Sequence, residues 1–168
     1  MKGSSVLLGS LLAIATSVAY AANPAFKDYT VSPEFTGINH EPVPQEHSSP
    51  IMDKAREQAL KGKVNFAGHY ILYMFACGGS SICGHVLDAR TGEVVGGLPN
   101  AYEGNTFDTS FVPDSRLIII SGVTANGEKD ARGNRLKNRY RDRYYEFVNN
   151  EFRLVKRVDA EPPTLDEE

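Results

Sequence analysis

The sequence predicts a mainly β protein of the α+β class, a single antiparallel β-meander domain of about six or seven strands with one N-terminal amphipathic helix. Three observations support this prediction. Segments rich in aromatic and β-branched residues recur after residue 63, and Gly, Asn, Asp or Pro separates each from the next. Residues 50–61 show a helical spacing of apolar side chains. The length of 168 residues suits one folded domain.

The first 21 residues have the features of a secretory signal peptide. Lys2 precedes an apolar run over residues 6–18, and the small-residue triplet Ala19-Tyr20-Ala21 follows it. The apolar run is shorter than the roughly 20 residues of a transmembrane helix. No cysteine stands at the cleavage point to receive a lipid. We therefore expect a signal peptide at residues 1–21, cleavage after Ala21, and a soluble mature chain in the periplasm or outside the cell, without membrane insertion.

The charge of the chain is mildly acidic overall and uneven along its length. The formal net charge is −3 at pH 7, with 18 Lys and Arg against 21 Asp and Glu. This balance argues against a nucleic acid as the partner. Residues 128–143 contain seven basic residues, whereas residues 159–168 contain five acidic residues and no basic one. We expect residues 159–168 to form an acidic, disordered tail.

The segment before the strands is expected to form an arm and a helix. Residues 22–49 read as a proline-rich extended arm that lies over the domain, with one short strand near residues 26–31. A helix is expected over residues 50–61, because Ser49 can cap its N-terminus, a proline suits its first position and Gly62 follows its last turn. Its shared apolar face comprises Ile51, Ala55, Ala59 and Leu60.

The β-rich domain, helix included, is expected to span residues 50–158. Its first strand lies within residues 64–77, which are apolar on both alternating faces. The helix can cover one of these faces, and a second layer or a closed barrel the other. The strands come in pairs whose members are joined by turn residues at hairpin spacing, as in an antiparallel meander. The later strands are expected at residues 82–89, 93–98, 105–112, 116–121, 144–148 and 151–158.

The two cysteines, Cys77 and Cys83, flank a Gly-Gly-Ser-Ser-Ile segment. A hairpin centred on Ser80 would place Cys77 directly opposite Cys83, at about 4.5 to 5.5 Å between Cα atoms, a distance that a disulfide spans. An even number of cysteines in an exported chain also favours a disulfide. We therefore predict a Cys77–Cys83 disulfide that staples the tip of a hairpin.

Two functional alternatives for these cysteines stay open. In one, Cys77, Cys83 and His85 hold a metal. The expected register pairs Phe75 with His85, so His69 would lie about 20 Å from the position opposite His85 and cannot join this set. In the other, a free cysteine acts as a nucleophile with a histidine as its base. We expect His69 to be a core or edge histidine rather than a catalytic one.

Residues 121–140 are polar, contain several glycines and are long for a loop in a compact domain, which is typical of a functional segment. We expect this loop and the start of the next strand to bind an acidic patch on a protein partner, because arginine and tyrosine are enriched at binding hot spots. The alternative is a solvated loop that keeps an edge strand from pairing with other chains. The expected partner-binding residues are Lys129, Arg132, Arg135, Lys137, Arg139, Arg143 and Tyr144.

Residues 62–92 resemble a group of uncharacterised exported bacterial proteins. In that group an Asn-Phe-Ala-Gly-His-Tyr strand runs into a turn with glycine and cysteine, and the next strand ends in an aspartate and a Thr-Gly turn. The matching residues here are 65–70, 77–83 and 88–92, with looser agreement at 113–122 and 144–155. The resemblance implies an exported, mainly β domain. It implies no activity and no catalytic residue.

No set of acid, base and nucleophile is recognisable in the sequence, and we assign no catalytic residue, metal ligand or cofactor. The sequence favours a non-enzymatic periplasmic or secreted binding protein, such as an inhibitor or an immunity-type factor, that docks another envelope or secreted macromolecule. Two alternatives come from other classes of protein. One is an envelope hydrolase that uses Cys77 or Cys83 with His69 or His85, and the other is a periplasmic metal-binding protein.

Overall fold

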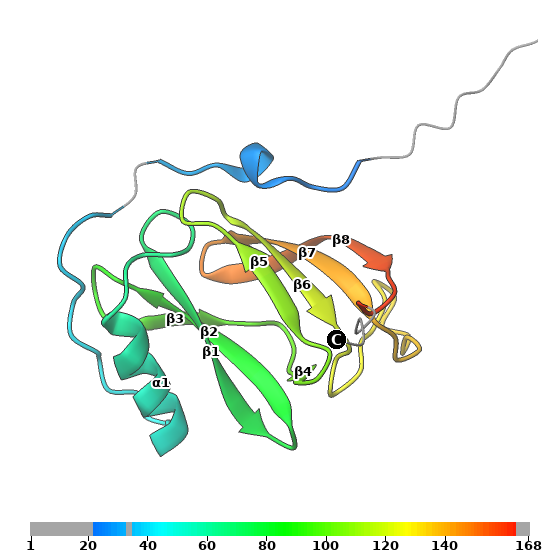
Figure 1. Ribbon diagram of the computed structural model, residues 1–168, viewed down its shortest axis with the longest axis horizontal. Coiled ribbons are helices and arrows are strands. Elements are labelled where there is room, and N and C mark those ends of the chain that lie inside the picture. The colour runs from blue at the N-terminus through cyan, green and yellow to red at the C-terminus, as the bar shows by residue number, and fades with distance from the viewer. Residues whose placement is uncertain (1–21, 33–34, 164–168) are drawn as a thin grey trace, which may run out of the picture.

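The computed structural model describes residues 22–32 and 35–163, so the expected signal peptide lies outside the described residues. Two four-stranded antiparallel sheets, one α-helix and one 3-10 helix form this part of the chain, which confirms the mainly β class (Figure 1). The second layer predicted from the first strand is a separate sheet rather than the wall of a closed barrel. The eight strands exceed the expected number, partly because one of them has only two residues.

Both sheets are built mainly from strands that follow one another along the chain. The first sheet has the order β1-β2-β3, with β4 paired to the other end of β2, and the second has the order β5-β6-β7-β8. The strands of the first sheet are β1 (Tyr70–Gly78), β2 (Ser81–Asp88), β3 (Val94–Gly97) and β4 (Tyr102–Glu103). Those of the second are β5 (Asp108–Phe111), β6 (Leu117–Gly122), β7 (Arg141–Val148) and β8 (Glu151–Asp159).

The first residue expected in the acidic tail, Asp159, is the last residue of β8. Its pairing with Arg141 of β7 extends the folded domain one residue beyond the expected boundary. Residues 160–163 follow the strand, and residues 164–168 lie outside the described part of the chain.

Apolar side chains fill both faces of the first sheet, as the composition of its first strand predicts. Between the two sheets lies a core that includes Leu72, Val86, Ile118, Ile120 and Phe147. The opposite face packs against the helix α1 (Pro50–Leu60). That second cluster includes Ile71, Tyr73, Phe75, Leu87, Met52, Ala55 and Ala59. Burial of these apolar groups removes them from water and stabilises the three-layer arrangement.

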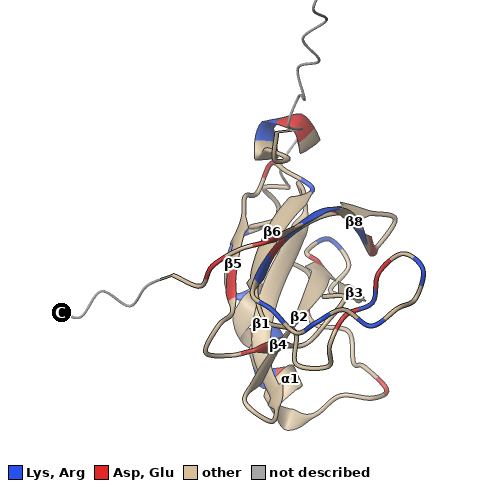
Figure 2. Cartoon of the chain, turned by 90° about the vertical axis from the view of Figure 1, so that its right-hand side faces the viewer, with Lys and Arg blue, Asp and Glu red and all other residues tan. Residues whose placement is uncertain are grey.

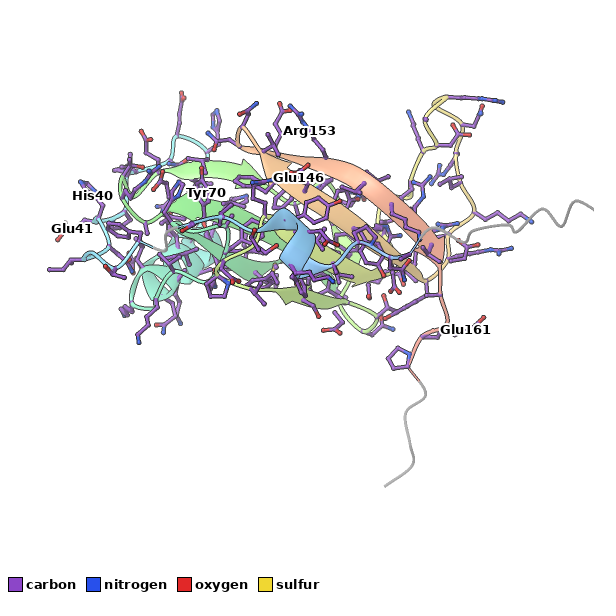
Figure 3. The ribbon with its side chains drawn as sticks, turned by 90° about the horizontal axis from the view of Figure 1, so that it is seen from above. His40, Glu41, Tyr70, Glu146, Arg153 and Glu161 are labelled. Atoms are coloured by element: carbon purple, nitrogen blue, oxygen red, sulfur yellow. A yellow bond between two sulfur atoms is a disulfide. The ribbon has the colours of Figure 1, made fainter. Side chains whose placement is uncertain are left out.

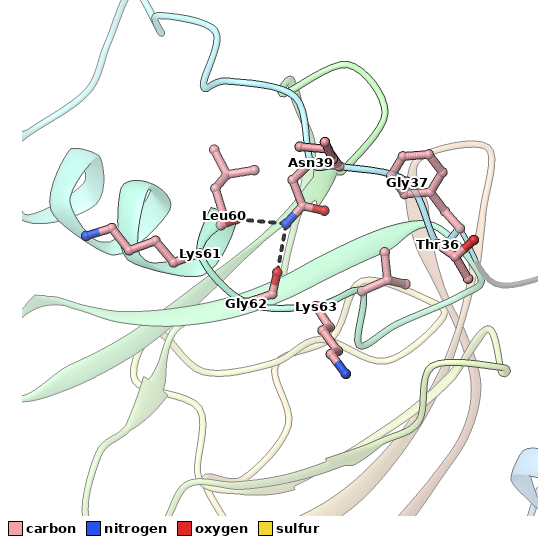
Figure 4. Close-up of a pocket in the computed structure, with 10 residues that line it drawn as sticks. Thr36, Gly37, Asn39, Leu60, Lys61, Gly62 and Lys63 are labelled. Carbon is pink, nitrogen blue, oxygen red and sulfur yellow. Dashed lines mark hydrogen bonds between the residues drawn. The ribbon is translucent and has the colours of Figure 1, made fainter.

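Helix α1 is capped at both ends. Ser49 Oγ accepts a hydrogen bond from the Met52 amide at 3.3 Å, as its position predicts. At the other end, Asn39 Nδ2 donates to the carbonyl oxygens of Leu60 at 2.8 Å and Gly62 at 2.7 Å (Figure 4). The last carbonyls of a helix have no partner within it, so these bonds satisfy groups that would otherwise need water. The arm therefore supplies the C-terminal cap of the helix.

The prediction of a short strand near residues 26–31 is wrong. Residues Phe26–Tyr29 form the 3-10 helix η1, in which the Asp28 amide donates to the Ala25 carbonyl at 3.0 Å. The β-type pairing of this segment is limited to a single bridge between Thr30 and Ser115, which lies in the turn between β5 and β6. The local hydrogen bonds of η1 take the place of the ladder that a strand would need.

The arm continues around the first sheet toward the helix. The His40 amide donates to the Ala89 carbonyl at 2.8 Å, just beyond the end of β2. His40 and Glu41 lie at one end of the molecule, and Glu161, which follows β8, lies at the other (Figure 3). The arm is thus bound to the domain at several points, as expected of a segment that lies over it.

The predicted disulfide is confirmed, although its register differs from the prediction. The sulfur atoms of Cys77 and Cys83 are bonded, and their Cα atoms are 5.7 Å apart. However, Cys83 is paired with Phe75, and His85 is paired with Tyr73. The prediction that the two cysteines are directly opposed is therefore wrong, and so is the expected pairing of Phe75 with His85.

The difference in register comes from the turn. Gly79 and Ser80 alone form it, both with positive φ (56° and 60°), as a two-residue type I′ turn requires. Gly78 then pairs with Ser81, and Cys77 is left as the extra residue of a bulge. The disulfide joins this bulged residue to the neighbouring strand.

Strand β1 begins later than predicted because residues 65–70 form a tight turn. Ala67 and Gly68 both have positive φ, of 43° and 84°. The Asn65 side chain replaces a backbone partner, since its Oδ1 accepts from the Leu72 amide at 2.8 Å and its Nδ2 donates to the Leu72 carbonyl at 3.0 Å. An alanine in the left-handed region is strained, so the packing around this turn must hold it there.

Candidate functional site: a cationic hairpin

The long loop between β6 and β7 is folded rather than irregular. Residues 128–137, here called the cationic hairpin, double back on themselves through a bridge between Lys129 and Arg135. The Leu136 amide donates to the Glu128 carbonyl at 2.9 Å, which closes the base of the hairpin. Lysine and arginine residues recur at intervals of two or three positions along this segment (Figure 2). The basic residues are therefore displayed on a defined structure.

Asp130 organises the tip of the hairpin. Its carboxylate accepts hydrogen bonds from the Arg132 amide at 2.8 Å, the Asn134 amide at 2.9 Å and Asn134 Nδ2 at 3.0 Å. These bonds, above all those from Asn134, lower the pKa of Asp130. Gly133 supplies the positive φ of 83° that the turn needs. The one acidic side chain at the tip is thus committed to holding the turn.

A buried ion pair anchors the base of the hairpin to the second sheet. Arg143 Nε and Nη2 donate to the two carboxylate oxygens of Glu128, each at 2.7 Å. The side chain of Arg143 is fully buried and that of Glu128 is 5% exposed. Arg143 Nη1 also donates to the carbonyls of Gly122 at 2.9 Å and Arg141 at 3.0 Å, and its guanidinium lies over the Tyr102 ring. All three nitrogens of this buried guanidinium therefore donate hydrogen bonds.

Arg141 fixes the other arm of the hairpin. Its Nη1 donates to Glu128 at 3.1 Å, its Nη2 to the Lys137 carbonyl at 3.0 Å and its Nε to Asp159 at 2.6 Å. Arg139 Nη1 reaches the same Asp159 carboxylate at 3.1 Å. The two ends of the hairpin are therefore tied to β7 and β8 through charged hydrogen bonds, which are the stronger kind.

The electrostatic balance keeps the Glu128 carboxylate ionised. Burial raises the pKa of Glu128. The hydrogen bonds and charge of Arg143, together with the charges of Arg157 and Arg141, lower this pKa by more than burial raises it. The net result is a pKa below the ordinary range for glutamate. The same contact with Glu128 raises the pKa of Arg143 despite its burial. Both members of the pair therefore carry their charges at neutral pH.

The structure divides the predicted partner-binding residues into three sets. Lys129, Arg132, Arg135 and Lys137 are exposed on the hairpin. Arg139 is exposed as well, but it is paired with Asp159. Arg143 and Tyr144 are buried, with residue exposures of 0% and 6%, so the prediction that they contact a partner is wrong for the folded domain. Glu128 and Asp159, which hold the hairpin, were not anticipated, because each stands among other charges in the sequence.

The disulfide bears on the two alternative roles of the cysteines, as metal ligands and as a catalytic nucleophile. The described residues contain no free cysteine, so neither a thiolate nucleophile nor a cysteine metal ligand is available while the bond is intact. Within residues 22–32 and 35–163, no helix is long and apolar enough to cross a membrane. A stable disulfide is consistent with the periplasm or the extracellular space, where oxidising conditions maintain such bonds.

His69 lies beside an acid but forms no catalytic pair. Its Nε2 is 3.7 Å from Asp88 Oδ2 and has no hydrogen-bond partner among the described residues. Arg90 already engages both oxygens of Asp88, at 2.8 and 3.1 Å. Burial and the charge of Arg90 lower the pKa of His69, which Asp88 offsets only in part. The imidazole is therefore neutral at pH 7, on the wall of a cavity and not oriented by the acid.

That cavity, of about 610 Å³, lies between the turn at residues 65–70 and the ends of β7 and β8. Tyr70, Glu146 and Arg153 line it (Figure 3). Glu146 accepts a hydrogen bond from Arg116 Nη2 at 2.9 Å and is paired across the sheet with Arg153. The carboxylate on this wall is thus ion-paired with Arg116. Four residues of the turn, Ala67 to Tyr70, line this cavity.

No protein-family model matches the chain, and comparisons with curated proteins and with solved structures found no match either. The fold and the site therefore define the class of protein by themselves. It is a protein of two packed antiparallel sheets with one disulfide-closed hairpin and one ion-anchored cationic hairpin.

Proposed function

We propose that this protein is a non-enzymatic binding protein, exported to the periplasm or beyond by a signal peptide at residues 1–21, whose cationic hairpin docks onto an acidic surface of another envelope or secreted protein. An inhibitor and an immunity-type factor are proteins of this kind. The observation that carries the proposal is the display of Lys129, Arg132, Arg135 and Lys137 on a hairpin whose base is held by a buried ion pair.

The anchoring favours binding because it lowers the cost of ordering. A flexible loop loses conformational freedom when it binds, and that loss subtracts from the affinity. Here the Glu128–Arg143 pair and the Asp130 turn hold the hairpin in one conformation before any partner arrives. A charged pair in a protein interior is seldom the most stabilising choice, since apolar residues of similar volume stabilise as well or better. Its presence at the base of the hairpin is consistent with a role in positioning.

The local charge favours an acidic partner. The hairpin carries four exposed basic side chains and two acidic ones, of which Asp130 is engaged at the tip and Glu128 is buried and paired with Arg143. The chain as a whole is acidic, with a net charge of −3. The hairpin therefore concentrates positive charge on one segment of a mildly acidic chain, which orients the encounter with an acidic surface and accelerates association at low salt.

The test uses two variants with the same change in net charge. In the first, Lys129, Arg132, Arg135 and Lys137 are replaced by glutamate. In the second, the exposed lysines Lys27, Lys54, Lys61 and Lys63, which lie outside the hairpin, are replaced by glutamate. The mature wild-type protein and both variants are immobilised and exposed to an envelope extract, and captured proteins are identified and quantified at two salt concentrations.

We expect the hairpin variant to lose a protein that the wild type and the control variant both retain, and the captured amount to fall as salt rises. Thermal unfolding of the hairpin variant should be close to that of the wild type, because exposed charges contribute little to stability. Equal capture by all three proteins, or equal loss in both variants, would show that the hairpin is a solvated guard of the sheet edge and not a docking surface.

A further inference from the structure

A second site of distinct chemistry lies on the other side of the molecule, where the arm passes over α1 and the outer face of the first sheet (Figure 1). A partly open cavity of about 230 Å³ lies there. Residues 45–48 of the arm, Met52 and Arg56 of α1, and Tyr73, His85 and Val94 of the sheet form its walls. Three separate elements thus bring an arginine, a tyrosine and a histidine together around one small volume.

Arg56 has donor groups that the fold does not use. Its side chain is 8% exposed, and Nη2 donates to Asp53 Oδ1 at 2.8 Å. Its Nε is buried and has no hydrogen-bond partner among the described residues. Asp53 is 45% exposed and also accepts from Ser48 Oγ at 2.6 Å, so solvent and a second donor share its charge. A buried cation with an unused Nε–H group calls for an acceptor that the described residues do not provide.

Tyr73 and His85 supply neutral polar groups next to this cation. Tyr73 Oη is 3.5 Å from His85 Nδ1, at the outer limit of hydrogen bonding, so the hydroxyl is free to engage a third group. Burial raises the pKa of Tyr73 to about 12, and the hydroxyl therefore keeps its proton. Burial and the charge of Arg56 lower the pKa of His85, which leaves the imidazole uncharged at neutral pH.

We propose that this cavity binds a small monocarboxylate, whose two oxygens accept hydrogen bonds from Arg56 and from the Tyr73 hydroxyl. Guanidinium and carboxylate are matched in shape and charge. The volume is below the roughly 300 to 1,000 Å³ of sites for drug-sized ligands, so the acid has a short chain. Met52 and Val94 provide apolar contact for that chain. Glu46, which lines the cavity, and Asp53, which accepts a hydrogen bond from Arg56, disfavour anions of higher charge, such as phosphate.

The test is a titration of the mature wild-type protein with acetate, propionate and butyrate, followed by NMR on the Arg56 Nε–H group and the His85 ring. Acetamide, propionamide and butyramide serve as uncharged matched ligands, and sodium chloride at equal ionic strength as the salt control. We expect saturable shifts at Arg56 and His85 with the acids alone. In Tyr73→Phe, which removes only the hydroxyl, the dissociation constant should rise about tenfold.

The cationic-hairpin variant separates this proposal from the docking function, because it should bind the acids as well as the wild type does. The proposal is overturned if the acids give no saturable shift, if the amides or chloride give the same shifts, or if Tyr73→Phe binds as tightly as the wild type.

Discussion

Glu128 and Arg143, fifteen residues apart in the sequence, form a doubly hydrogen-bonded ion pair with both N···O distances at 2.7 Å. The pair is almost entirely shielded from solvent and joins the loop after β6 to the middle of β7. It therefore connects the stability of the second sheet to the position of the cationic hairpin.

Removing one member of this pair should be strongly destabilising. In Glu128→Gln the Arg143 guanidinium stays buried without a counter-charge, which typically costs about 3 to 5 kcal/mol. The measurement is the free energy of unfolding in urea. Arg135→Gln, at an exposed position of the same hairpin, should change it by less than about 1 kcal/mol. If Glu128→Gln is no more harmful than Arg135→Gln, the buried pair does not anchor the hairpin.

Replacing both members together should cost less. In the double variant Glu128→Met, Arg143→Met the fully buried guanidinium of Arg143 is gone, and the buried Arg141 keeps Asp159 as its counter-charge, so the stability should recover part of the loss seen in Glu128→Gln. The same variant should lose capture of the partner if the pair serves to position the hairpin. Stability below that of Glu128→Gln would contradict this account of the pair.

The pair also predicts how stability depends on pH. The pKa of Glu128 is lower in the folded protein than its ordinary value of 4.5. The unfolded state therefore binds a proton more readily, and the stability contributed by Glu128 is present above about pH 4.5 and is lost as the pH falls through the folded pKa. Unfolding in urea at pH 7, 5, 4 and 3 measures this loss. The decline should be shallower in Glu128→Gln than in wild type, and equal slopes would rule out Glu128 as its source.

The disulfide should make a modest contribution. Cys77 and Cys83 close a short loop, so their bond restricts the unfolded chain by about 2 kcal/mol on the loop-entropy model. The variant Cys77→Ser, Cys83→Ser should unfold with a free energy lower by about this amount while keeping its circular dichroism spectrum. Protein isolated from the periplasm should show no reactive thiol until it is reduced. A reactive thiol in the unreduced protein would contradict this prediction and would favour a catalytic or metal-binding cysteine.

Gly92 should be critical for docking of the arm. It has a positive φ of 73°, and a Cβ at this position would overlap the Glu41 carbonyl oxygen. The Val43 amide donates to the Gly92 carbonyl at 3.0 Å. We expect Gly92→Ala to detach this part of the arm and to accelerate its cleavage in limited proteolysis. Gly133→Ala is the matched control, because its φ of 83° imposes similar backbone strain and its Cβ would meet no atom within 4 Å.

Local chemistry explains why much of the fold is predictable. Ser49, Pro50 and Gly62 define the ends of the helix through capping and the fixed φ of proline, which depend on a few adjacent residues. The strands after residue 100 follow alternating apolar residues and turn residues in the same way. Predictions failed where one residue changes the pairing. The bulge at Cys77 shifts the register, and one 3-10 turn replaces the strand expected near residue 26.

The sequence by itself determined the mainly β class, the single helix and the pairing of the two cysteines, because these depend on periodicity, capping and short spacing. Only the tertiary structure decided which basic residues face solvent, since the burial of Arg143 depends on Glu128 reaching it from a separate loop. The same is true of the cavity around Arg56, where helix and sheet bring Tyr73 and His85 together. Charges and polar groups acquire their roles from neighbours that are distant along the chain, and folding alone brings those neighbours into contact.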